Sequence, residues 1–258
     1  MSDFLRLVRE GAVARLLIDR TSKQNAFTQE MWETLPELVA EATANPAVRV
    51  LILQSAAGTT FCAGADIAEF SAGASDPDWR SRNQAAIRRA QHELARAEKP
   101  TIALIEGNCI GGGCGLAIAC DLRVAAPAAR FGITPSRLGL VYSLHDTKLL
   151  VDLVGPSQAK RILFTGSLIG ADEAQRIGLV DLVDEDAAEA ADALAKEIAS
   201  SSPHSVRASK KMIRRILDGQ AEDDEETLRQ FDSAFKGEDF QEGVSAFLAR
   251  RKPQFRSR

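Results

Sequence analysis

The sequence predicts a mixed α/β fold with buried strands and a helical C-terminal part. Continuous apolar runs at 48–55 and 101–107, rich in β-branched residues, are typical of strands that are buried on both faces. Segments with apolar residues at helical spacing separate these runs, and helical spacing dominates from about residue 144 onward. The chain has 258 residues, of which 45% are hydrophobic, so it can bury a full hydrophobic core.

The N-terminal half begins with a predicted hairpin over 4–19 that turns at Glu10 and Gly11, because its second run alternates apolar and polar side chains. Thr28 is a candidate N-cap for a helix over 28–45, whose apolar residues lie on one face. A buried strand is then expected at 48–55.

The rest of the chain continues this alternation of strands and helices. A helix is predicted over roughly 79–98, and strands are predicted at 101–107, 122–126 and 178–183. The sequence SSSP at 200–203 offers both a joint and an N-cap for the next helix. The chain therefore divides into a core, 1–200, and a helical C-terminal subdomain, 201–258.

Composition and charge exclude several classes of function. The net charge of −4 gives no global basic field for nucleic acid, and no apolar stretch approaches the roughly 20 residues of a membrane span. The opening residues lack the apolar centre of a secretory signal, so we expect a cytoplasmic protein. Four cysteines without a C-x-x-C pair and three scattered histidines predict no metal site, only buried, reduced thiols.

The stretch NCIGGGCGLAIACD, 108–121, puts three glycines between a predicted strand and a predicted helix. Such a turn leaves unpaired N–H groups at the positive end of a helix dipole, where they suit an oxyanion; a tight turn with close backbone packing is the alternative. No Gly-Lys-Ser/Thr follows for a nucleotide phosphate, and Leu116 breaks the dinucleotide fingerprint.

A second glycine loop has the same surroundings. The sequence FCAGAD, 61–66, also follows a buried strand and runs into a predicted helix at Asp66 and Ile67. Two loops with free N–H donors can bind one oxygen between them.

Taken together, FCAGADIAEF, GNCIGGGCGLAIACDLRVAA, ARFG and FTGSLIGADEAQRIGLVD resemble the enoyl-CoA hydratase/isomerase (crotonase) superfamily, and the likeness covers nearly the whole chain. The resemblance implies an α/β, crotonase-like spiral of ββα repeats, with C-terminal helices that form a homotrimer or a dimer of trimers. It also implies an acyl-CoA thioester as substrate. No further cofactor is expected, since CoA is part of the substrate.

The resemblance also assigns residues. The backbone N–H groups of Ala65 and Gly112 would form an oxyanion hole for the thioester oxygen, and the segments 23–26 and 63–67 would line the CoA. Arg250 would contact a CoA phosphate across a subunit boundary. The residues expected to bind substrate are Lys23, Gln24, Ala26, Ala63, Asp66, Ile67, Pro135, Gly139, His145, Phe247 and Arg250.

Two positions depart from the hydratases of this family, which carry glutamates there for acid–base catalysis. This chain has Gly115 and Pro135 instead, so ordinary hydration is not expected. The segments GITPSRLGLVYSL and EDFQEGVSAFLARRKPQF resemble the methylmalonyl-CoA decarboxylase branch. The first of them matches that branch's T-P-x-x-L-G-x-x-Y pattern and contains Tyr142, the single tyrosine of the chain.

Loss of CO₂ from a malonyl-type thioester produces the enolate directly, so the missing carboxylates favour decarboxylation of a methylmalonyl- or ethylmalonyl-type CoA thioester. Tyr142 would hold the departing carboxylate or protonate the enolate; a core tyrosine is the alternative. His145 and Asp146 could reach the same pocket or lie at the surface. Ser143 cannot form a triad with them, because residues one and two apart on a helix do not face each other.

Two other functions stay open. The first is an enoyl-CoA hydratase or isomerase that uses Asp146 or His145 in place of the missing glutamates. The second is a catalytically silent CoA-binding homologue, since the loss of both carboxylates could equally mark an inactive enzyme.

Overall fold

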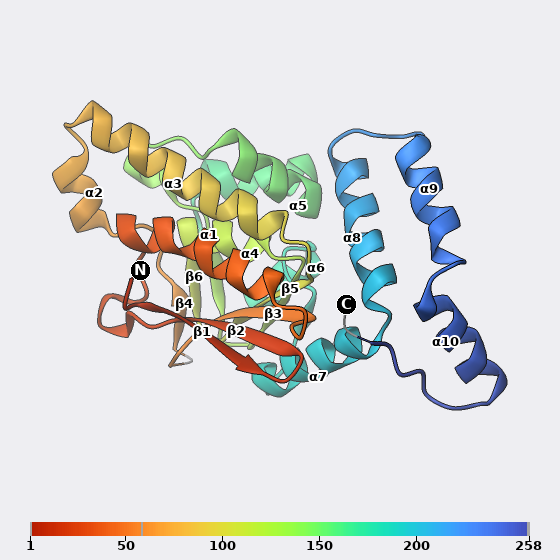
Figure 1. Ribbon diagram of the computed structural model, residues 1–258. Helices are drawn as coiled ribbons and strands as arrows, with labels where there is room; N and C mark the ends of the chain where they lie inside the picture. The colour runs from red at the N-terminus through yellow and green to blue at the C-terminus, as the bar shows by residue number, and fades with distance from the viewer. Residues whose placement is uncertain (1, 58, 257–258) are drawn as a thin grey trace.

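Two β-sheets surrounded by helices form the core of the computed structural model, which describes residues 2–57 and 59–256 (Figure 1). The strands of the larger sheet, in spatial order, are β1 (Leu5–Glu10), β2 (Val13–Ile18), β3 (Val50–Ser55), β5 (Thr101–Ile105), β7 (Leu122–Ala125) and β10 (Leu182–Val183). The first two form the predicted antiparallel hairpin, and the other neighbours pair in parallel. The predicted strands at 48–55, 101–107 and 122–126 are therefore confirmed, with ends shifted by a few residues.

The larger sheet is covered on both faces. Leu51 and Leu53 of β3 pack in a core cluster with α1 (Gln29–Ala44), whereas Val50 and Ile52 pack against α7 (Ala187–Ser200). Successive side chains of a strand point to opposite faces, so a sheet buried on both sides needs an unbroken apolar run. The predicted helix over 28–45 is α1, and the Thr28 side chain accepts a hydrogen bond from the Met31 N–H.

A smaller sheet stands beside the first. It contains β4 (Thr60–Cys62), β6 (Asn108–Ile110), β8 (Arg130–Gly132) and β9 (Ile169–Gly170). Its first three strands run parallel, and β9 pairs with β8 in the antiparallel sense. Strands of two or three residues are too short to show a periodic pattern, so sequence analysis did not predict them.

Five more helices in the described residues belong to the core. In chain order they are α2 (Ile67–Gly73), α3 (Pro77–Ala95), α4 (Gly112–Ala119), α5 (Leu144–Thr165) and α6 (Ala171–Arg176), with the 3₁₀ turns η1 (Thr21–Lys23) and η2 (Pro135–Leu138). Two of them, α2 and α4, follow the two glycine loops. The helix predicted over 79–98 is α3. It begins earlier because Asp76 caps it and Pro77 occupies its first position.

The last helices lie to one side of the core. The helix α8 (Pro203–Leu217) lies next to the core, and α9 (Glu225–Ala234) and α10 (Glu238–Leu248) lie on the far side of α8 (Figure 1). Large apolar side chains are exposed on them: Phe231 is 66% exposed and Phe247 is 83% exposed. A subdomain boundary near residue 200 and trimer formation remain predictions.

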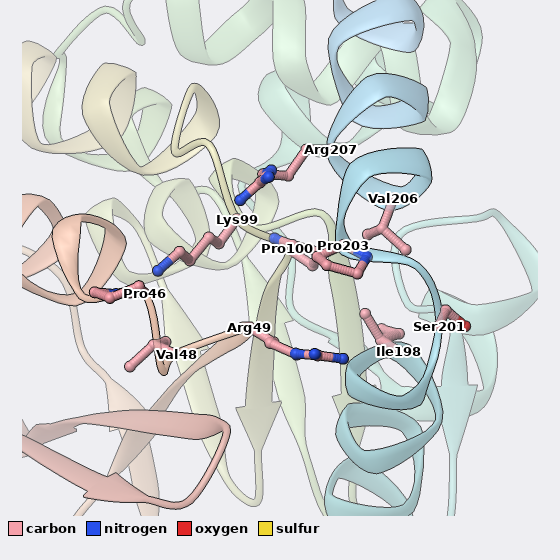
Figure 2. A pocket seen from close by; sticks show the side chains of 10 residues that line it. All are labelled: Pro46, Val48, Arg49, Lys99, Pro100, Ile198, Ser201, Pro203, Val206 and Arg207. Carbon is pink, nitrogen blue, oxygen red and sulfur yellow. The ribbon is translucent and has the colours of Figure 1, made fainter. Parts of the chain in front are cut away.

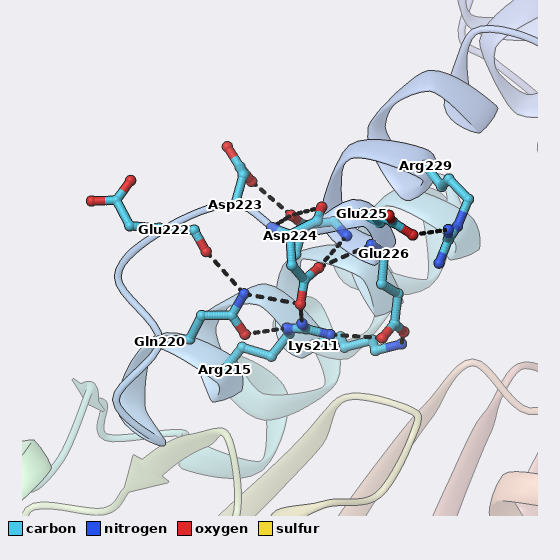
Figure 3. A network of polar contacts seen from close by, with 10 residues as sticks. Lys211, Arg215, Gln220, Glu222, Asp223, Asp224, Glu225, Glu226 and Arg229 are labelled. Atoms are coloured by element: carbon cyan, nitrogen blue, oxygen red, sulfur yellow. Dashed lines mark hydrogen bonds and ion pairs between the residues drawn. The ribbon is translucent and has the colours of Figure 1, made fainter.

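Ion pairs and hydrogen bonds connect α8 to the start of α9 (Figure 3). The Arg215 guanidinium pairs with the carboxylates of Asp224 and Glu226, and Lys211 also pairs with Glu226. Asp224 caps α9 and accepts from the Thr227 N–H. These contacts fix the direction in which α9 leaves α8.

Long cationic side chains, Arg49, Lys99 and Arg207, line a small pocket between the core and the start of α8 (Figure 2). Arg49 donates to the carbonyl of Ala199 at 2.6 Å and to the carbonyl of Phe255. Lys99 donates to the carbonyls of Ala42 and Asn45 at the end of α1. The cavity between them measures only about 20 Å³, room for roughly one water molecule. None of the helices in the described residues is long and apolar enough to cross a membrane.

Candidate active site

Two glycine loops meet at one edge of the smaller sheet, because β4 and β6 run parallel and both end there. Gly64 follows β4 with φ +98°, a backbone conformation that disfavours a side chain. A Cβ on Gly64 would stand 3.0 Å from the Ile110 carbonyl oxygen and 3.2 Å from the Gly112 nitrogen. The first loop therefore lies in direct backbone contact with the second.

The two loops contact each other a second time at Gly113. A Cβ there would stand 2.3 Å from the carbonyl oxygen of Cys62, closer than any atom can approach. The first turn of α4 thus packs on the end of β4 with no room for a side chain. This packing is consistent with both predictions for these glycines: a tight turn with close backbone packing, and a turn whose free N–H groups bind an oxyanion.

The backbone N–H groups of Ala65 and Gly112 donate to no acceptor in 2–57 or 59–256. Ala65 forms a parallel bridge with Phe27, in which the Phe27 N–H donates to the carbonyl of Gly64 and the Asp66 N–H donates to the carbonyl of Phe27. The Ala65 N–H is therefore left out of the bridge. Gly112 is the first residue of α4, so its N–H has no partner within the helix.

The two donors belong to backbone segments that lie close together. The Ala65 nitrogen lies 3.7 Å from the place where a Cβ on Gly112 would stand. The positive end of the α4 dipole adds to the attraction for negative charge. This arrangement can bind an oxygen atom that becomes an anion during a reaction.

The segments predicted to line CoA are joined to each other by backbone hydrogen bonds. The Ala63 N–H donates to the carbonyl of Gln24 at 3.0 Å, and the Ala26 N–H donates to that of Lys23. Ile67 is 56% exposed at the start of α2. The structure therefore brings Lys23, Gln24, Ala26, Ala63, Asp66 and Ile67 to one place beside the Ala65 N–H.

The Asp66 carboxylate has local partners. It pairs with Arg20 at 2.7 Å and caps α2 by accepting from the N–H groups of Ala68 and Glu69. The hydrogen bond from Arg20 is the largest cause of its lowered pKa. Asp66 thus holds the loop and α2 in place with its side chain.

Tyr142 lies against the second turn of α4. Its hydroxyl oxygen is 3.1 Å from the place where a Cβ on Gly115 would stand. The oxygen is buried and has no hydrogen-bond partner in the described part of the chain. Since Gly112 and Gly115 are three residues apart on α4, the hydroxyl lies one helical turn from the N–H donor of Gly112.

Gln91 of α3, which sequence analysis missed, occupies the remaining room at Gly115. Its terminal amide is 2.1 Å from the place of a Cβ on Gly115, and the residue is 1% exposed. With its nitrogen toward Asp146, the amide donates to both carboxylate oxygens, at 2.5 and 2.8 Å. A polar residue between Ala90 and Leu94, on the buried side of a predicted helix, is the signal that could have found it.

Asp146 is 3% exposed, so it lies in the interior and not at the surface. Burial raises its pKa, although His145, Ser143 and Gln91 lower it in part. The His145 Nδ1 lies 3.1 Å from the Asp146 Oδ1, so the expectation that these adjacent side chains cannot meet was wrong. His145 itself is half-buried at the first turn of α5. The Ser143 hydroxyl accepts from the Asp146 N–H and caps α5, so it has a structural role there.

The other predicted substrate-binding residues lie outside the two glycine loops. Pro135 and Gly139 begin and follow η2, which leads the chain into Tyr142. Phe247 is at the end of α10 and Arg250 follows it, on the far side of α8 from the core (Figure 1). The structure of one chain therefore does not bring Phe247 or Arg250 to the loops, and their contact with substrate remains a prediction that needs a neighbouring subunit.

All four cysteines are free and buried, as expected. Burial raises the pKa values of Cys62 and Cys120 to about 12. A thiol with such a pKa is not ionised at neutral pH, so these two residues are not nucleophiles.

The sequence pattern of the enoyl-CoA hydratase/isomerase family matches residues 8–258. The chain belongs to the enoyl-CoA hydratase/isomerase family. The crotonyl-CoA hydratase of Syntrophomonas wolfei is 36% identical over an alignment of 259 positions that covers 98% of this chain and 97% of that protein. The short-chain-enoyl-CoA hydratase of Clostridium acetobutylicum is 34% identical over 95% of both chains.

Solved structures of family proteins show the same fold. An enoyl-CoA hydratase/isomerase family protein from Hyphomonas neptunium has a TM-score of 0.96 and 42% identity, over 99% of this chain and 98% of that chain. An enoyl-CoA hydratase/carnithine racemase from Magnetospirillum magneticum has a TM-score of 0.94 and 34% identity, over 100% and 97%. The fold is the crotonase fold, as predicted, and the protein is an acyl-CoA enzyme of this family. None of these relatives singles out the methylmalonyl-CoA decarboxylase branch.

Proposed function

We propose that the enzyme decarboxylates a methylmalonyl- or ethylmalonyl-type CoA thioester. The observation that carries this proposal is that two free N–H donors and the hydroxyl of Tyr142 lie in the same site. The hydroxyl is buried without a hydrogen-bond partner among the described residues, and it lies against α4 one helical turn from Gly112. Gly115 and Pro135 bring no carboxylate to this site. An oxyanion hole and a proton donor match the needs of decarboxylation, a reaction that requires no general base.

In the proposed reaction, the thioester oxygen accepts hydrogen bonds from Ala65 and Gly112. The bond between C2 and the carboxylate breaks, CO₂ leaves, and the electron pair passes into the enolate. One oxyanion-hole donor of this kind stabilises a transition state by about 2.7–4 kcal/mol. The Tyr142 hydroxyl then gives its proton to C2 and leaves the saturated acyl-CoA.

The electrostatics of Tyr142 agree with this direction of proton transfer. Burial is the largest cause of its raised pKa, and the nearby Asp146 charge adds to it. The phenol therefore keeps its proton at neutral pH and can act as an acid, but not as a base that removes a proton from substrate. An enolate is basic enough to take that proton.

A second candidate function is hydration or isomerisation of an enoyl-CoA with Asp146 as the acid–base group. Its support is the buried Asp146 carboxylate, whose raised pKa suits general acid–base catalysis and which reaches the Gly115 region through Gln91. The two relatives named above are called hydratases. In this alternative Asp146 replaces the catalytic glutamate that the hydratases of the family carry at the position of Gly115.

Incubation with methylmalonyl-CoA and with crotonyl-CoA distinguishes the candidates. We expect propionyl-CoA from the first substrate and no loss of enoyl absorbance with the second. Consumption of crotonyl-CoA alone would support hydration and contradict decarboxylation. Binding of both thioesters without turnover of either would indicate a silent CoA-binding homologue. The Gly112→Pro variant, which lacks one N–H donor, controls for turnover outside the site.

A further inference from the structure

Gln91 and Asp146 form a buried polar pair behind Tyr142 that the proposed reaction does not use. Gln91 comes from α3 and Asp146 from α5, and each is at most 3% exposed. The Gln91 amide donates to both oxygens of the carboxylate, at 2.5 and 2.8 Å. Burying a carboxylate and an amide costs free energy even when they are paired, so their position calls for a reason.

The place that the pair occupies gives this reason. The Gln91 amide and the Tyr142 hydroxyl lie 2.1 and 3.1 Å from the same point, the place of a Cβ on Gly115. Both groups therefore share the room that a side chain at residue 115 would fill. The amide is therefore bonded to Asp146 and also lies near the Tyr142 hydroxyl.

We propose that Gln91 is a positioning residue for the proton donor. Its amide, held by both oxygens of Asp146, fills the place of a side chain at residue 115 and shields the Tyr142 hydroxyl from the charge of that carboxylate. This inference rests on the proposed function for its catalytic meaning, but the shielding itself can be tested without substrate.

Shielding matters because Tyr142 must release its proton. The ionisable groups facing Tyr142 are Asp146 on α5, Cys114 on α4 and Cys109 on β6, and each raises the pKa of the phenol. Among these groups, Asp146 contributes most to raising the pKa of Tyr142. Asp146 is in turn contacted by Gln91, Ser143 and His145. The ring of His92 lies 5.9 Å from that of His145. Two hydrogen bonds from an amide disperse the negative charge, so the phenol gives up its proton more readily than it would beside a bare carboxylate.

The proton balance is closed by water. Tyr142 transfers its proton to C2 of the enolate and becomes a phenolate. The phenolate then takes a proton from water, and the hydroxide left behind combines with the released CO₂ as bicarbonate; the neighbouring carboxylate favours this step because it disfavours a second negative charge. Gln91 thus sets how strongly the donor holds its proton and takes no part in bond making.

The single tyrosine of the chain permits a direct test without substrate. Phenolate absorbance during an alkaline titration reports Tyr142 alone, while circular dichroism at each pH confirms that the protein stays folded. We expect Gln91→Met, which keeps the size but removes the amide, to move phenolate formation upward by about one pH unit. Gln91→Leu is a second variant in case the first does not fold.

A double-mutant cycle shows whether Asp146 is the source of the effect. Asp146→Asn removes the charge, so phenolate should form at lower pH than in the unmodified protein. In that background Gln91→Met should no longer move the titration, because there is no charge left to shield. The matched control is Asn83→Leu, which removes a buried amide from the same helix; Asn83 donates to Gln29 at 2.7 Å.

Kinetics with methylmalonyl-CoA supply the second readout. We expect Gln91→Met to lower kcat by about three- to tenfold with KM unchanged within about twofold, whereas Asn83→Leu should leave both unchanged. An identical phenolate titration in Gln91→Met and the unmodified protein would overturn the inference, even if decarboxylation is observed. If methylmalonyl-CoA is not decarboxylated, the proposed function fails, and the titration cycle still decides whether Gln91 shields Tyr142.

Discussion

A Cβ on Gly113 would stand 2.3 Å from the carbonyl oxygen of Cys62, so the first turn of α4 rests on the end of β4 with no side chain between them. This contact sets the spacing of the two loops that carry the Ala65 and Gly112 N–H groups. Both the stability of the fold and the geometry of the oxyanion hole depend on it.

Replacing Gly113 by alanine should therefore destabilise the protein. Overpacking of a tight interior contact costs about 1–3 kcal/mol, and here the obstructing atom is backbone, which cannot move aside cheaply. Urea denaturation measures the loss. Gly243→Ala in α10 is the control, since the nearest atom to its Cβ would be 4.0 Å away. Equal midpoints for the two variants would contradict the packing described here.

Gly112→Pro tests the oxyanion hole with little risk to the fold. Gly112 is the first residue of α4, a position that accepts proline, although Trp32 must move by a few tenths of an ångström. The change removes the N–H donor, so we expect kcat to fall by about 10²–10³-fold. Gly112→Ala adds the same Cβ but keeps the N–H and should retain most of the activity. A similar loss in both variants would assign the effect to packing against Trp32.

Tyr142→Phe should separate activity from stability. Loss of the proton donor should lower kcat by about 10²–10⁴-fold, with little change in thioester binding. The same change removes a buried hydroxyl that has no partner, so the free energy of unfolding should stay the same or rise. Turnover assays and thermal unfolding measure the two effects. An unchanged rate would make Tyr142 an ordinary core residue.

Asp146→Asn should change how stability depends on pH. Because burial raises the pKa of Asp146, the folded protein binds more protons than the unfolded chain between the usual aspartate pKa, about 3.9, and the raised value. Stability of the unmodified protein thus falls as pH rises through that window. The advantage of Asp146→Asn in thermal unfolding should grow from about pH 4 to pH 7.

The control for this experiment is Asp152→Asn on the same helix. Asp152 is less buried and pairs with Lys148 at 2.6 Å, so its replacement should give no advantage that grows toward neutral pH. A pH-independent difference for Asp146→Asn would mean that its carboxylate is not penalised by burial.

The success of prediction differed between parts of the fold for a physical reason. The hairpin, α1 and β3 could be predicted because six or more residues share one periodic pattern, which reflects the faces they bury. The strands β4, β6 and β8 could not, since three residues show no period. These short strands are the ones that bring the two glycine loops together.

The residues of the candidate site also differ in whether a local sequence pattern points to them. Ala65, Gly112 and the segments 23–26 and 63–67 could be proposed from the sequence because their motifs are local. Gln91 was missed because its role depends on Asp146, which is far along the chain. Phe247 lies in α10 and Arg250 follows that helix, and within one chain neither residue is near the two glycine loops.

The family, the two glycine loops and the lack of carboxylates at positions 115 and 135 can be recognised in the sequence, because each is contained in a short run of residues. The groups that lie beside Gly115 are known from the three-dimensional structure alone. There α3 and α5 place the Gln91 amide and the Tyr142 hydroxyl over α4. That arrangement depends on the packing of helices distant in the chain, which no local pattern encodes.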